Sequence, residues 1–112
     1  MAASVSSYRN GDGLTVVVSG EVDLATAPLL TDAVDAATAS DGAATVTVEL
    51  SEVTFLDSSG IAALLKGRRV ADERGRAYRV VGATGTVLEV LELTGVWTHL
   101  SGEQAAGEAS LT

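Results

Sequence analysis

Residues 45–65 have the sequence TVTVELSEVTFLDSSGIAALL, in which a strand pattern gives way to a helix pattern. Residues 45–50 are rich in β-branched side chains, which favours a central strand. Residues 51–57 are expected to form a connection against the core, because three of them are apolar. A helix is expected from about Ser59 to Glu73, and its inner face would carry Ile61, Leu64 and Leu65. The stretch therefore predicts a strand-to-helix junction with two adjacent serines.

Upstream of this junction the sequence predicts a hairpin and a helix. Two strands, Val5–Tyr8 and Leu14–Ser19, flank an Asn-Gly-Asp-Gly turn, and Gly20 is expected to end the second strand. Thr26-Ala27-Pro28 marks a helix start, since proline is tolerated in the first turn. This helix should end near Ser40-Asp41-Gly42 and bury the apolar positions spaced i, i+3, i+4 and i+7, which are Leu30, Ala33, Val34 and Ala37.

Downstream of the junction we expect a strand at Ala77–Val81 and then a helix capped by Thr86 and ending at Thr94-Gly95. Its inward residues would be Val87, Val90 and Leu91, and Val96–Leu100 fits either a short strand or a helix. Because strands alternate with helices from residue 45 onward, the pairing should be largely parallel there. The fold class is α/β, with a small mixed sheet of about four to five strands and about three to four helices.

Composition agrees with one small domain. The chain has 112 residues, of which 46% are hydrophobic and only 4% aromatic, so the core must be aliphatic. We expect the domain to occupy residues 1–100 and residues 101–112 to form a flexible tail, because the tail is small and polar.

Charge and residue usage exclude several function classes. The formal net charge of −8 opposes binding to nucleic acid phosphates. The absence of cysteine and the single histidine leave little material for a metal site, and no cofactor is expected. No signal peptide or apolar run long enough to span a membrane is evident, so we expect a cytoplasmic protein that does not bind membranes.

Asp57-Ser58-Ser59-Gly60 is the strongest candidate site. One reading is a simple cap, in which Asp57, Ser58 or Ser59 accepts a hydrogen bond from a backbone N–H at the start of the helix. The other is a switch, because a serine at the positive end of a helix can carry a phosphate. The two are compatible: if Ser59 capped the helix, Ser58 would be the freer hydroxyl.

Three blocks of sequence, one of which contains this candidate site, together form a longer pattern that spans most of the chain. They are GEVDLATAPLL at 20–30, VTVELSEVTFLDSSG at 46–60 and LELTGV at 91–96. In this order and spacing they resemble the STAS-domain family, and within it the anti-anti-sigma factors (anti-sigma factor antagonists). The resemblance covers roughly residues 5 to 100. It implies a mixed sheet flanked by helices.

The resemblance also implies a function by partner switching, without catalysis by this chain. Ser58 would be the phosphorylation site, and Glu21, Asp23, Asp57, Ser59 and Gly60 would contribute to the partner surface around it. The unphosphorylated form would bind an anti-sigma factor that is a serine kinase, and so free a sigma factor for transcription. Phosphorylation would abolish binding, and a serine phosphatase would reset the protein. We expect the free protein to be a monomer.

Other interpretations stay open at this point. A STAS-like module could instead bind a small ligand such as a nucleotide, or serve as a scaffold in a signalling assembly. Glu21 and Asp23 could cap a helix or face solvent. A serine hydrolase would need His99 as base for Ser58, and the G-x-S-x-G pattern of such enzymes is absent.

Overall fold

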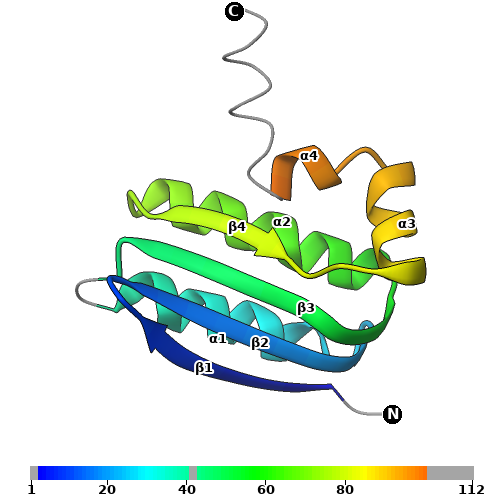
Figure 1. Cartoon of the computed structure of the whole chain (residues 1–112), viewed down its shortest axis with the longest axis horizontal. Coiled ribbons are helices and arrows are strands. Elements are labelled where there is room, and N and C mark those ends of the chain that lie inside the picture. The colour runs from blue at the N-terminus through cyan, green and yellow to red at the C-terminus, as the bar shows by residue number, and fades with distance from the viewer. Residues whose placement is uncertain (1–2, 41–42, 101–112) are drawn as a thin grey trace, which may run out of the picture.

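The computed structural model describes residues 3–40 and 43–100, which form four strands and four helices (Figure 1). Their bounds, in chain order, are β1 Ser4–Asn10, β2 Gly13–Val22, α1 Ala27–Ala39, β3 Thr45–Leu56, α2 Ser58–Glu73, β4 Ala77–Val81, α3 Gly85–Leu93 and α4 Trp97–Leu100. The tail expected at 101–112 lies outside the described residues. Among the helices that are described, none is long and apolar enough to cross a membrane.

The four strands form one mixed sheet in the order β1-β2-β3-β4. β1 pairs antiparallel with β2 through the predicted hairpin, and β2, β3 and β4 run parallel. Both parallel connections step in the same direction across the sheet, so right-handed crossovers put α1 and α2 on the same face (Figure 1). The predicted α/β class and mixed sheet are confirmed.

The core lies between the sheet and these two helices. Alternate positions of the parallel strands β2, β3 and β4 are fully buried, as period-2 patterning requires, among them Val16, Val18, Val46, Val48 and Val80. They pack in one cluster with the inner faces of α1 and α2, which supply Leu30, Val34 and Leu64. The one buried aromatic residue of the described core is Tyr78, whose hydroxyl donates to the backbone carbonyl of Leu64 at 2.9 Å.

The junction before α2 differs from its prediction. Residues 51–56 continue β3 instead of forming a connection, and β2 continues past Gly20 to Val22. The two strands stay paired through register shifts between Val17 and Ser19 and between Gly20 and Glu21. These shifts break the regular alternation of buried and exposed side chains that marks a strand in a sequence. The predicted C-terminal ends of these two strands were therefore wrong.

Helix boundaries show smaller differences. α3 begins at Gly85 with Thr84 as its N-cap residue, so the cap predicted at Thr86 is wrong. Val87 and Leu91 are buried as expected, whereas Val90 is only half-buried. Residues 97–100 form the short helix α4.

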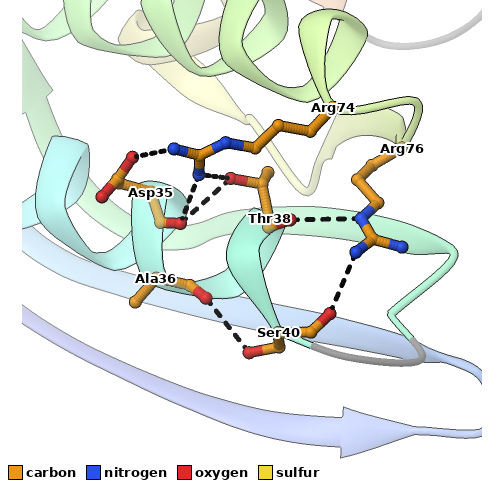
Figure 2. Close-up of polar contacts among 6 residues, drawn as sticks. All are labelled: Asp35, Ala36, Thr38, Ser40, Arg74 and Arg76. Atoms are coloured by element: carbon orange, nitrogen blue, oxygen red, sulfur yellow. Dashed lines mark hydrogen bonds and ion pairs between the residues drawn. The ribbon is translucent and has the colours of Figure 1, made fainter.

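Two arginines after α2 tie its C-terminal end to that of α1 (Figure 2). The Arg74 guanidinium donates to the Asp35 carbonyl at 2.9 Å and to the Thr38 hydroxyl at 2.8 Å, and it pairs with the Asp35 carboxylate at 3.1 Å. Arg76 donates to the carbonyls of Thr38 and Ser40 at 3.1 and 3.3 Å. Because the last carbonyls of a helix lack intrahelical partners, these bonds cap α1 as well as join it to α2.

Candidate functional site

The candidate site forms where the parallel strands β2 and β3 end side by side. Val22 pairs with Leu56, and the Asp57 amide donates to the Val22 carbonyl at 3.3 Å. Glu21 and Asp23, which flank Val22, therefore lie next to the Asp57–Gly60 segment. The two acidic residues are 34 or more residues from the Asp57–Gly60 segment in the sequence, and the pairing of β2 with β3 brings them together.

Asp57 is the N-cap residue of α2. Its carboxylate oxygen Oδ1 accepts from the backbone N–H groups of Ser59 at 2.8 Å and Gly60 at 3.2 Å. Its carbonyl accepts the first helical bond, from Ile61, at 3.0 Å. The cap therefore uses neither serine hydroxyl, and the helix begins at Ser58, one residue earlier than predicted.

Ser58 is the first residue of α2 and is exposed. Its hydroxyl makes no hydrogen bond with the part of the chain that the structure describes. A carboxylate already satisfies the N–H groups at the helix end, so this hydroxyl is available for chemistry or for contact with another molecule.

Ser59 and Gly60 have different surroundings. Ser59 is half-buried and lines a hollow between α1 and α2. Gly60 is buried, and a Cβ added there would lie 3.0 Å from the Val22 carbonyl oxygen and against the Leu56 side chain. Gly60 thus lets α2 approach the end of β2 closely.

Asp23 fixes the turn that leads into α1. Its Oδ1 accepts from the backbone N–H groups of Ala25 at 3.0 Å and Thr26 at 3.1 Å. The Thr26 hydroxyl lies 3.0 Å from the same oxygen and 2.8 Å from the Glu21 carbonyl. The hydrogen bonds from Thr26 hold the pKa of Asp23 below its ordinary value. Asp23 therefore stays ionised beside the serine segment, while Glu21 is half-buried at the end of β2.

A groove between α1 and α2 was not predicted. One hollow of about 320 Å³ begins at Ser59 and is lined by Leu24, Ala27, Pro28, Thr31, Ala62, Ala63 and Lys66. A second of about 270 Å³ shares Thr31 and Lys66 with it and continues to Val70. The side chain of Leu24 at its mouth is 79% exposed. The available sequence signal was Leu24, a large apolar residue in the turn three residues before the start of α1.

The structure does not bring His99 to Ser58. The His99 carbonyl accepts a hydrogen bond from the Arg68 guanidinium, and Arg68 follows Ser58 by ten residues, or about 15 Å of helix. Within residues 3–40 and 43–100, no group of three or more acidic or histidine side chains is placed to hold a metal ion.

Comparison with known proteins assigns the fold to a family. A family model described as "Mlab, STAS domain" matches residues 6–101. The chain belongs to the STAS-domain family. The site described above therefore sits in a STAS domain, at the start of its second helix.

Three relatives of this STAS domain are informative. The anti-sigma-B factor antagonist of Listeria monocytogenes is 24% identical over 100 residues, which cover 89% of this chain and 87% of the relative. The crystal structure of an anti-sigma factor antagonist from Mycobacterium paratuberculosis has 29% identity and a TM-score of 0.77, covering 88% of this chain and 82% of that one.

The third relative is the anti-sigma factor antagonist SpoIIAA, solved in two forms. Its unphosphorylated form matches with 19% identity and a TM-score of 0.61 over 80% of this chain and 82% of that one. Its phosphorylated form, from Bacillus, has 15% identity and a TM-score of 0.66 over 95% and 99%. Because these identities are low, the two SpoIIAA structures support only the fold of this STAS domain.

Proposed function

We propose that this STAS domain is an anti-sigma factor antagonist controlled by phosphorylation of Ser58. In its unphosphorylated form it binds an anti-sigma factor that is a serine kinase, and so frees a sigma factor. Phosphorylation of Ser58 abolishes binding, and a serine phosphatase restores it. The observation that carries the proposal is the exposed, unbonded hydroxyl of Ser58 on a helix end capped by another residue.

The relatives support this choice of function. Two proteins that match most of the chain carry the name anti-sigma factor antagonist or anti-sigma-B factor antagonist. SpoIIAA, which shares the fold, exists in phosphorylated and unphosphorylated forms. An antagonist is named for its effect on another protein, and we assign a non-catalytic mode of action, by binding, to this chain.

The charges around Ser58 explain how a phosphate would act. Phosphorylation adds about −1.5 to −2 charges at pH 7. Asp57 and Asp23 already place negative charge at this end of the molecule. Because Asp57 holds the N–H groups of Ser59 and Gly60, the phosphate would not find those donors free and would project outward. The fold would stay in place while the surface changed.

The magnitude required is modest. A hundredfold loss of affinity corresponds to about 2.7 kcal/mol. Two unit charges about 4 Å apart interact by about 4 kcal/mol at an effective dielectric constant of 20. A phosphate in a closely fitted interface can supply this loss by steric clash with the partner, and by repulsion from any acidic group that lies there.

The partner surface would comprise Glu21, Asp23, Asp57, Ser58 and Ser59. Its acidic side chains favour a partner that presents basic groups there, which also argues against direct contact with nucleic acid. Gly60 is buried, so we assign it a supporting role in bringing α2 against β2.

The test uses the full chain and the anti-sigma factor kinases of the same genome, each produced separately. Calorimetry should show binding by the wild type and by Ser58→Ala, and a loss of at least about 100-fold with Ser58→Asp. Ser7→Asp is the matched control, because Ser7 is an exposed serine on the edge strand β1. It should bind like the wild type.

Two further measurements complete the test. After incubation with the kinase and ATP, mass spectrometry should place the phosphate on Ser58, and binding should then be lost. Equal binding by Ser58→Ala and Ser58→Asp would overturn the switch. Stabilisation by nucleotide alone, with no kinase bound, would favour the small-ligand interpretation instead.

A further inference from the structure

Lys66 is the only lysine of a strongly acidic chain, and it lies in the groove between α1 and α2. Its ammonium makes no hydrogen bond or ion pair with the described residues. Arg68 and Arg74, by contrast, have carboxylate partners. Lys66 is exposed, as are Arg69 and Arg79, but among the described cations it alone lines both hollows of the groove.

The chemical character of the groove changes along its length. Near Ser59 it is apolar, with Leu24, Ala27, Pro28, Ala62 and Ala63 on its walls. Lys66 and Thr31 line the middle, where the two hollows meet. Beyond them stands Asp32, which is exposed and unpaired among the described residues, whereas the neighbouring carboxylate of Asp35 is held by Arg74.

We propose that Lys66 is a docking residue that binds a carboxylate of the anti-sigma factor. The partner segment would place an apolar side chain against Leu24 and Pro28, a carboxylate at Lys66 and a basic group near Asp32. Charge complementarity carries this choice, because Lys66 is the cation that lines both hollows and a carboxylate is its natural complement. The inference rests on the proposed function and extends its surface beyond Ser58, because Ser59 lines the same hollow.

The groove thereby complements the Ser58 end. At Ser58 this chain presents carboxylates, and at Lys66 it presents a cation, so a partner must match both signs in order along α2. A surface with both signs of charge disfavours partners that carry only basic groups, whereas a purely acidic surface would accept them.

Substitution provides the first test, with the anti-sigma factor that binds in the experiments above. Lys66→Glu should weaken binding at least about tenfold, because it places like charges together in the interface. Arg69→Glu is the matched control: it changes the charge by the same amount on the same helix, outside the groove lining. It should change affinity less than about threefold. Circular dichroism checks that both variants fold.

Chemical modification provides a second test that needs no substitution. Acetylation of amines on the wild type should label Lys66 in the free chain and be suppressed in the complex, while the terminal amine serves as the internal reference. A zero-length carbodiimide cross-linker should join Lys66 to an aspartate or glutamate of the anti-sigma factor, which mass spectrometry would identify.

The outcomes separate this inference from the proposed function. Loss of binding with Ser58→Asp but none with Lys66→Glu, together with undiminished acetylation, would overturn the docking role and leave the switch intact. A cross-link from Lys66 to a second copy of this chain would overturn it in favour of self-association. Failure of the wild type to bind any anti-sigma factor would overturn both.

Discussion

Replacement of Asp57 by alanine should destabilise the protein by removing the cap of α2. The variant loses a carboxylate oxygen that accepts two backbone hydrogen bonds, at 2.8 and 3.2 Å. Loss of an N-cap side chain costs about 1 kcal/mol, and loss of a negative charge at a helix N-terminus costs about 0.5 kcal/mol more. We therefore expect a decrease of about 1.5 kcal/mol in the free energy of unfolding.

Asp57→Asn separates the two contributions. Asparagine keeps an acceptor of the same shape and is as good an N-cap residue as aspartate, so it should lose only the charge contribution, about 0.5 kcal/mol. The two variants should therefore differ by about 1 kcal/mol.

Urea unfolding measures this difference, with the fluorescence of Trp97, the only tryptophan, and circular dichroism as two probes. With an m-value of about 1.5 kcal/mol/M, Asp57→Ala should lower the midpoint by about 1 M and Asp57→Asn by about 0.3 M. Equal losses in the two variants would refute the argument, because the hydrogen bonds would then contribute nothing. An unchanged midpoint for Asp57→Ala would refute the cap altogether.

The remaining predictions concern the packing beneath the site and its surroundings. Burial raises the pKa of Tyr78, so above pH 10 only the unfolded chain ionises there; the free energy of unfolding should fall with rising pH, and Tyr78→Phe should lessen that fall in alkaline urea titrations. Gly67→Ala puts a Cβ 2.7 Å from the Tyr78 hydroxyl and should cost about 1–3 kcal/mol, seen as a lower melting temperature; full stability would show that Tyr78 moves freely. Arg74→Ala removes three contacts to α1 and should cost about 1 kcal/mol, with faster amide exchange at the C-terminal turn of α1; uniform exchange changes would contradict a local clamp. Below pH 3.8 the lowered pKa of Asp23 predicts a loss of stability that Asp23→Asn should not show, measured by thermal melts across that range.

The sequence predicted the elements whose side chains follow one period. The aliphatic alternation of residues 45–50 and the i, i+3, i+4 spacing in α1 correspond to buried faces in the structure. In α2 only Leu64 of the three residues predicted to face inward is buried, and Ile61 and Leu65 are half-buried. The pattern failed where β2 and β3 shift register near Gly20, because a bulge lets the backbone stay paired while side chains change sides. The ends of β2 at Val22 and of β3 at Leu56 are set by backbone pairing between the two strands, which produces no periodic pattern of side chains in the sequence.

The candidate site was likewise predictable from the sequence only in part. Ser58 could be singled out because the D-S-S-G string and the helix that follows are local, and the proximity of Glu21 and Asp23 followed only through the family resemblance. The identity of the cap residue depended on side-chain geometry, so three candidates remained until Asp57 was placed. The groove forms only when α1 packs against α2, so the sequence could not predict it. The position of Lys66 in the groove could therefore be recognised only in the structure.

The arginine bonds between the helix ends have a mechanical consequence. Arg74 and Arg76 hold α1 and α2 together at one extremity (Figure 2), whereas Ser58 lies at the other extremity of α2. Separation of the two helices at the arginine end would have to break all of these contacts together. The arginines therefore help to set the spacing between the two walls of the groove in which Lys66 lies.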